Sequence, residues 1–220
     1  MAFTFREKIK TLLILIKEPK VLTKLLSLRL FGYLIDVGWF NAFTIGEPVD
    51  KNLEPLPWLT YSFIDFITER LSKEFNVFEF GSGNSTLFFA ERVKQVSSVE
   101  HNREWYNKLK SKIPVNSNLI LSKSDCSEDY IAVLKQSDKK FDLIIIDGIH
   151  RADCCLSASN YLTDKGVIIL DDSEREQYSE GIEKLINEGF KRIDFWGISP
   201  GYLYKKDTTV FYKTQNCLGI

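Results

Sequence analysis

The sequence predicts a doubly wound α/β domain preceded by helices, and three observations carry that prediction. Between residues 77 and 135, strand and helix patterns alternate every 20 to 25 residues or so, about the length of one βα unit. Two later runs, 141–147 and 166–171, are continuously apolar, as in central parallel strands covered on both faces. The final strands, 190–198 and 207–213, are joined by a link too short for a helix, so they must pair antiparallel.

Seven strands are predicted in all. They cover residues 77–80, 95–100, 118–121, 141–147, 166–171, 190–198 and 207–213, and helices cover 58–71, 103–112, 128–135 and 174–188. The sheet is therefore expected to be mostly parallel, with an antiparallel hairpin at its C-terminal end.

The N-terminal region is expected to form a separate helical extension. A loop rich in turn residues places the boundary between residues 1–55 and the main domain at 56–220. Residues 1–36 hold seven basic and three acidic side chains, and their apolar run is too short to span a bilayer. These basic helices either lie peripherally on an anionic membrane or pack on the main domain or a second subunit, as in a homo-oligomer. Packing is favoured, because apolar stripes usually belong to a core.

Charge and cysteine content narrow the class of protein. The formal net charge is −1, so no overall basic field exists to hold a nucleic acid. The four cysteines form no CxxC motif and no zinc spacing. We therefore expect a cytoplasmic protein, membrane-peripheral if residues 1–36 bind lipid, that acts on a small molecule rather than a nucleic acid.

The first strand of the predicted sheet ends in a glycine loop, Glu79-Phe80-Gly81-Ser82-Gly83. Gly81 and Gly83 permit a tight turn and the close approach of a ligand to bare backbone. Thr86 stands where the dinucleotide fingerprint has its third glycine, so a typical pyrophosphate site is not indicated. A plain turn between strand and helix remains the alternative.

Acidic and polar residues end the next two strands. Glu100 ends the second strand, where a carboxylate can accept two hydrogen bonds from a ribose diol. Ser124 and Asp125 follow the third strand, and they either reach an adenine edge or cap the next helix.

On these residues the chain, over about 58–213, resembles the class I S-adenosylmethionine-dependent methyltransferases. An acid two positions before the first glycine, here Glu79, and a closing antiparallel hairpin are typical of that family. The resemblance implies a Rossmann-like fold and S-adenosylmethionine as cofactor. It assigns cofactor binding to Glu79, Gly81, Ser82, Gly83, Glu100, Ser124 and Asp125.

A further likeness is to small-molecule O-methyltransferases of the catechol and macrolide-sugar types, which place acids at the ends of strands four and five. Asp147, Asp171 and Asp172 stand at those ends here. Carboxylates that converge need positive charge between them, and hard oxygen ligands favour Mg²⁺. Helix caps and plain strand ends are the alternative.

His150 lies three residues after Asp147, and an imidazole is suited to take a proton from a hydroxyl at neutral pH. In the resembled sugar O-methyltransferases, an Asp-x-x-His pattern supplies a metal ligand and a general base. The sequence thus predicts O-methylation of a small-molecule hydroxyl, such as that of a sugar or glycoconjugate precursor. A nicotinamide-dependent oxidoreductase and a non-catalytic, membrane-associated binding module are the alternatives.

Overall fold

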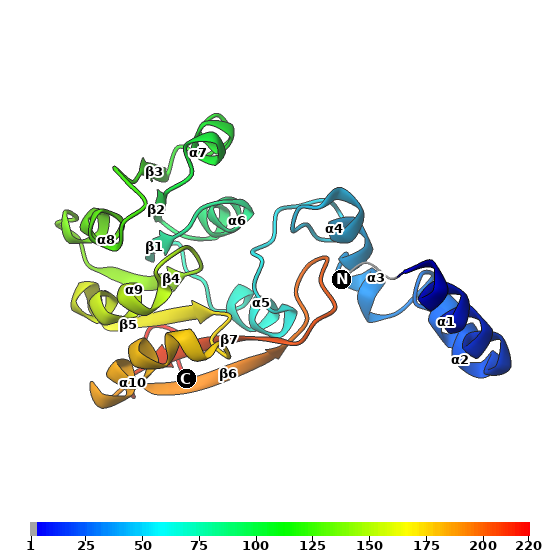
Figure 1. The fold of residues 1–220 in the computed structure, drawn as a ribbon. Coiled ribbons are helices and arrows are strands. Elements are labelled where there is room, and N and C mark those ends of the chain that lie inside the picture. The colour runs from blue at the N-terminus through cyan, green and yellow to red at the C-terminus, as the bar shows by residue number, and fades with distance from the viewer. Residues whose placement is uncertain (1–3) are drawn as a thin grey trace.

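A computed structural model describes residues 4–220, which form a seven-stranded sheet in the order β3-β2-β1-β4-β5-β7-β6 (Figure 1). The strands are β1 (Asn76–Phe80), β2 (Gln95–Glu100), β3 (Ser117–Leu121), β4 (Phe141–Ile146), β5 (Leu162–Asp171), β6 (Lys191–Gly197) and β7 (Lys206–Tyr212). Strands β1 to β5 run parallel, and β7 pairs antiparallel with both β5 and β6. The predicted doubly wound, Rossmann-like sheet with its closing hairpin is confirmed.

Helices cover both faces of the sheet. In chain order they are α1 (Phe5–Lys17), α2 (Pro19–Ser27), α3 (Tyr33–Asp36), α4 (Trp39–Ile45), α5 (Tyr61–Thr68), α6 (Asn84–Arg92), α7 (Arg103–Lys110), α8 (Ser127–Lys135), α9 (Arg151–Ala158) and α10 (Ser179–Asn187). Three predicted helices are shorter than expected. The last, at 174–188, is divided into a 3₁₀ turn, Glu176–Tyr178, and α10.

The alternation of side chains along the central strands builds two apolar layers. Phe78, Ile144 and Ile168 face one layer, whereas Val77 and Leu143 face the other. Because both faces are buried, these strands are apolar throughout, which is why the sequence shows continuous runs. The two layers fix the carboxyl ends of β1, β2, β4 and β5 at one edge of the sheet.

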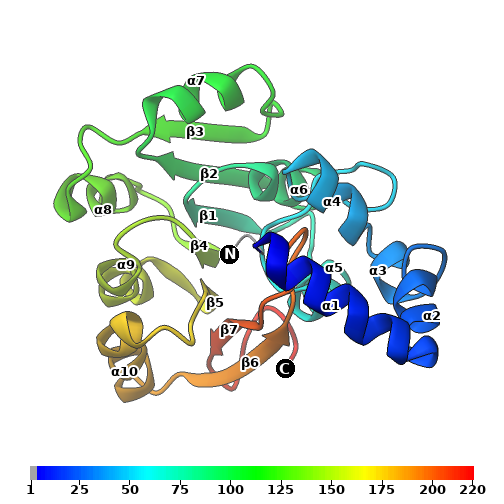
Figure 2. The ribbon, with the colours of Figure 1, turned by 45° about the vertical axis from the view of Figure 1, so that its right-hand side comes forward.

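The two N-terminal helices do not pack on the domain. Neither α1 nor α2 buries a residue, and together they project from the body as a helical hairpin, which stands clear of the sheet in Figure 1 and lies in front of the body in Figure 2. The expected packing on the main domain is not found, because the apolar stripes face outward instead of joining a core, whereas packing on a second subunit stays a prediction. None of the helices within residues 4–220 is long and apolar enough to span a membrane.

Gly148 lies where the loops after β1 and β4 approach most closely. A Cβ at this position would stand 2.1 Å from the Tyr130 hydroxyl and 3.0 Å from the Gly81 nitrogen. The hydroxyl belongs to a fully buried ring, so it has little room to retreat.

We expect Gly148→Ala to lower the free energy of unfolding by about 1–3 kcal/mol, the usual cost of overpacking. Adding Tyr130→Phe should recover part of that loss, because it removes the hydroxyl. Gly197→Ala is the matched control, since its Cβ would meet its nearest neighbour at 3.4 Å. Urea denaturation measures all three, and equal stability of Gly148→Ala and the control would contradict the packing argument.

Candidate active site

The glycine loop after β1 lies at the point where the strand order reverses, since β1 is flanked by β2 and β4. Ligands of open α/β sheets bind at such a point, beyond the carboxyl ends of the strands. Gly81 adopts a φ of +108°, and a Cβ there would stand 3.1 Å from the Asp147 carbonyl oxygen. Only glycine fits this turn, so the loop's glycine is explained by geometry.

A cavity of about 470 Å³ opens beside this loop, with Gly83 and Glu100 in its wall. Glu100 is only 4% exposed. Its Oε2 accepts a hydrogen bond from the Ser82 hydroxyl at 2.7 Å, and its Oε1 accepts one from the Asn102 backbone nitrogen at 2.8 Å. A buried carboxylate that accepts hydrogen bonds from hydroxyl groups can also accept them from a ribose diol. These residues therefore fit S-adenosylmethionine.

A second cavity, of about 620 Å³, continues past His101 and Asn102, which line both spaces. Ser124 and Asp125 lie in its wall, on the side expected for adenine. The Ser124 hydroxyl donates to Asp129 Oδ2 at 2.7 Å, and the Cys126 nitrogen donates to Ser124 Oγ at 3.3 Å. Ser124 thus takes part in the turn before α8, and the choice between an adenine contact and a helix-start role stays open.

Trp105 is a cavity residue that the sequence did not reveal. Its indole nitrogen donates to the Ser82 carbonyl oxygen at 2.9 Å, which holds the glycine loop against α7. Its ring also lies 3.7 Å from where a Gly83 Cβ would be. Nothing in the spacing around Trp105 distinguishes it from an ordinary packing residue of an amphipathic helix.

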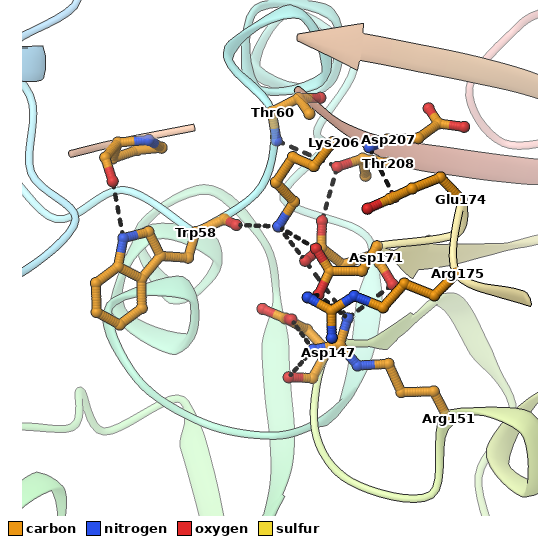
Figure 3. Close-up of polar contacts among 12 residues, drawn as sticks. Trp58, Thr60, Asp147, Arg151, Asp171, Glu174, Arg175, Lys206, Asp207 and Thr208 are labelled. Carbon is orange, nitrogen blue, oxygen red and sulfur yellow. Dashed lines mark hydrogen bonds and ion pairs between the residues drawn. The ribbon is translucent and has the colours of Figure 1, made fainter. Parts of the chain in front are cut away.

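The three predicted acids do converge, and two cations of this chain lie among them (Figure 3). Arg151 Nη2 contacts Asp147 Oδ1 at 2.9 Å, and Arg151 Nη1 contacts Asp172 Oδ2 at 3.1 Å. Lys206 Nζ contacts Asp172 Oδ1 at 3.0 Å and also pairs with Asp171 Oδ2. We call these five residues the ion network.

The ion network corrects the expectation of Mg²⁺. The carboxylates need positive charge, as predicted, but Arg151 and Lys206 supply it. Asp171 Oδ1 additionally accepts the Thr208 hydroxyl at 2.9 Å. No group of three His, Cys, Asp or Glu side chains within residues 4–220 is arranged to hold a metal ion. These residues therefore do not fit the predicted metal site.

Asp147 differs from the other two acids in its exposure and its proton affinity. Its side chain is 25% exposed, against 1% for Asp171. Burial, and next the charge of Asp171, raise the pKa of Asp147 to about 8, although Arg151 and Lys206 oppose the shift. The cavity wall thus holds a carboxyl group that titrates near neutral pH.

Glu79 lies deeper at the end of β1, and burial raises the pKa of this carboxyl despite a hydrogen bond from the Ser98 hydroxyl at 2.7 Å. Among the described residues it has no ion-pair partner, in contrast to Asp147. Glu79 lines a cavity, and a positively charged ligand in that cavity would oppose this shift and favour the ionised carboxylate.

His150 is not brought to the acids. It adopts a left-handed conformation with φ of +53°, and its Nε2 lies 2.7 Å from the Asp125 carbonyl oxygen. This turn directs the exposed ring toward the loop after β3, while the next residue, Arg151, points into the ion network. The expectation of a His150 base beside the acids is not met by this geometry.

The ion network forms one wall of a third cavity, of about 300 Å³. Trp58, Tyr202 and Tyr204 form the opposite, aromatic side. Trp58 and Tyr202 have ring centroids 5.8 Å apart, and the Trp58 indole donates to the Pro200 carbonyl oxygen at 2.9 Å. This cavity and the one beside the glycine loop share Trp58, Ser82, Ser85 and Asp147, so the two spaces adjoin.

Comparison with known proteins identifies a related family. Residues 78–173 match the family described as a methyltransferase domain. No curated protein matches the chain.

Solved structures share the fold at low sequence identity. Precorrin-6y C5,15-methyltransferase from Geobacter metallireducens has 14% identity and a TM-score of 0.52, covering 70% of this chain and 87% of its own. The O-methyltransferase TomG from Streptomyces achromogenes, solved with S-adenosylmethionine, has 13% identity and a TM-score of 0.51, covering 68% and 77%. Precorrin 8w decarboxylase from Methanobacterium thermoautotrophicum has 16% identity and a TM-score of 0.50, covering 69% and 88%.

Replacing Glu100 with alanine should weaken the binding of S-adenosylhomocysteine by about 1.5–3 kcal/mol, the range for hydrogen bonds to a charged group. Isothermal titration calorimetry measures the loss. Glu180→Gln, on exposed α10, controls for the change in charge. Unchanged affinity in the Glu100 variant would remove this residue from the cofactor site.

Replacing Lys206 with methionine should lower the free energy of unfolding by about 3–5 kcal/mol, because buried Asp171 loses the nearer of its two cations and keeps only Arg151, at 3.5 Å. The neighbouring exposed lysine gives the control, Lys205→Met, which should change stability little. Chemical denaturation at neutral pH compares them. Similar losses in both variants would show that the ion network is not what stabilises this edge of the sheet.

Proposed function

Residues 78–173 match a methyltransferase-domain family, and we propose that the protein is an S-adenosylmethionine-dependent methyltransferase that methylates a hydroxyl oxygen of a small molecule. The acceptor would occupy the cavity between the ion network and the aromatic side, and the cofactor would occupy the cavity beside the glycine loop. A sugar or glycoconjugate precursor is the acceptor class we favour.

The observation that carries the proposal is the position of Asp147. Asp147 lines both cavities, so an acceptor in one cavity and a cofactor in the other would meet beside its side chain. Its raised pKa, about 8, suits a group that must accept a proton near neutral pH. A hydroxyl needs such a base, because the oxygen becomes a good nucleophile only as its proton leaves.

S-adenosylmethionine, when bound, supplies an electrophilic methyl group on a sulfonium centre. The chain's own task is to align the acceptor oxygen and to remove its proton. Asp147 would take that proton on the oxygen left free by Arg151, which contacts Oδ1. Arg151 orients the carboxylate and keeps its pKa from rising further. Glu79 lies in the wall of the acceptor cavity, and a positively charged methyl donor that reached this wall would favour the ionised form of its carboxyl.

The aromatic side of the acceptor cavity supports a sugar-like acceptor. Trp58 and the two tyrosines line the cavity together with carboxylates and cations, so the cavity offers apolar and polar groups together. A ligand with hydroxyls on one side and C–H groups on the other matches both walls. Incubation with labelled S-adenosylmethionine and a panel of sugars, phenols and amines tests this. Transfer to an amine or a carbon atom, and not to oxygen, would overturn the proposal.

Asp147→Asn should lower kcat by about 10² to 10⁴, the usual contribution of a positioned base. Because the carboxyl is protonated below its pKa, the wild-type rate should rise through pH 8 and level off above it. Rates measured across pH 6 to 10 or so, at saturating substrates, show this profile. A profile in the Asn variant that matches wild type would exclude Asp147 as the base.

His150→Ala is the matched control for that experiment, because its side chain contacts the Asp125 carbonyl and not the acceptor cavity. It should retain the wild-type pH profile.

A chelator should leave the rate unchanged, since cations of the chain neutralise the acids. Loss of turnover with chelator and its return with Mg²⁺ would contradict this assignment.

A further inference from the structure

We propose that the helical hairpin formed by α1 and α2 docks the protein on anionic lipid bilayers. This inference is independent of the methyl acceptor. It begins from helices that are well formed but bury no residue. Thr4 and Glu7 cap α1 reciprocally, with the Glu7 nitrogen donating to Thr4 Oγ1 at 3.3 Å and the Thr4 nitrogen donating to Glu7 Oε2 at 2.8 Å.

The apolar side chains of both helices face outward. Those that are 44–76% exposed are Phe5, Ile9, Leu12, Leu13, Ile14, Ile16, Val21, Leu25 and Leu26. Soluble monomers rarely present so many apolar side chains together, and such a surface usually meets a partner or a membrane. Burying them would contribute about 25 cal/mol for each Å² removed from water.

The spacing on α1 sorts these residues into an apolar face with a basic border. Phe5, Ile9, Leu12 and Ile16 follow the i, i+4, i+7, i+11 pattern of one helix face. Arg6, Lys10 and Lys17 run alongside, in a shallow groove shared with Ile9 and Leu13. This border lets lysine and arginine stems lie on apolar surface while their charges reach outward, as interfacial helices require.

Charge decides which occupant this face suits. Residues 4–36 carry seven cations and three acids, a net charge of +4 in a chain whose total is −1. Two copies joined through this face would bring like charges together, which costs energy. An anionic bilayer offers the opposite charge and an apolar interior at once, and each basic residue near it contributes about 1 kcal/mol.

Exposed apolar residues continue from the hairpin toward the acceptor cavity. Leu30 and Phe31 follow α2, and Phe43 lies on α4, with its ring stacked on Trp39 at 5.2 Å. The Trp39 indole donates to the Tyr202 carbonyl oxygen at 3.0 Å, which joins α4 to the loop at the cavity's rim. Figure 1 shows α3 and α4 between the hairpin and the sheet. The bilayer-facing surface therefore extends beyond the two helices.

Vesicle sedimentation of the full chain tests the proposal. We expect binding to vesicles of phosphatidylcholine and phosphatidylserine in equal parts, weak binding to phosphatidylcholine alone, and release by salt. Replacing Arg6, Lys10 and Lys17 with glutamine should weaken binding on the order of 100-fold, about fivefold for each cation. The same change at Lys135, Lys165 and Lys191, which are exposed and outside the hairpin, should have little effect beyond overall charge.

A second variant, Leu12→Ser with Ile16→Ser, removes apolar surface without touching charge and should also reduce vesicle binding. Affinity for S-adenosylhomocysteine confirms that each variant is folded. Equal binding to neutral and anionic vesicles, or none to either, would overturn the proposal. So would a wild-type dimer that the serine variant converts to monomer, because the face would then join two copies of this chain.

Discussion

Three carboxylates at the ends of β4 and β5, two of them buried, are the constraint around which this end of the molecule is organised. Asp171 and Asp172 are almost fully buried, and buried charges cost several kcal/mol each unless they are paired. Arg151 and Lys206 supply two cations, and Arg175 reaches Asp172 Oδ2 at 2.6 Å from a more exposed position. With only two cations buried against three acids, one negative charge is poorly compensated. The pKa of Asp147 is raised, first by burial and next by the charge of Asp171.

The same ions determine where the acceptor cavity lies. Lys206 Nζ donates to the Trp58 carbonyl oxygen at 3.1 Å, so the cation that neutralises Asp171 also holds the segment carrying Trp58. Close by, the Thr60 nitrogen donates to Thr208 Oγ1, whose hydroxyl donates to Asp171. The aromatic side of the cavity is thereby fixed to the acidic side. Because Lys206 contacts both walls, the cavity keeps its shape before a ligand binds. Such preorganisation reduces the entropy lost on binding.

The parts of this structure that depend on residues close together in the sequence could be predicted. Continuous apolar runs revealed β4 and β5, and the short link before β7 revealed the antiparallel hairpin. Electrostatics also predicted that the acids require positive charge. The source of that charge could not be predicted, because Lys206 reaches Asp171 only through the pairing of β7 with β5. The position of His150 could not be predicted for a related reason: this left-handed residue places its ring against the Asp125 carbonyl oxygen, whereas Arg151 points into the ion network.

Charge is divided unevenly between the hairpin and the rest of the chain, and that division bears on how the protein would meet a bilayer. The total is −1 although residues 4–36 contribute +4, so the remaining residues are net acidic. An anionic surface would attract the hairpin and repel the domain, which favours an approach with the hairpin first. Arg29 lies over the Phe40 ring at 4.8 Å, linking the segment after α2 to α4. The hairpin is thus joined to the side of the domain that holds the acceptor cavity's rim, and docking would bring that rim toward the lipid while the acidic sheet stays in water.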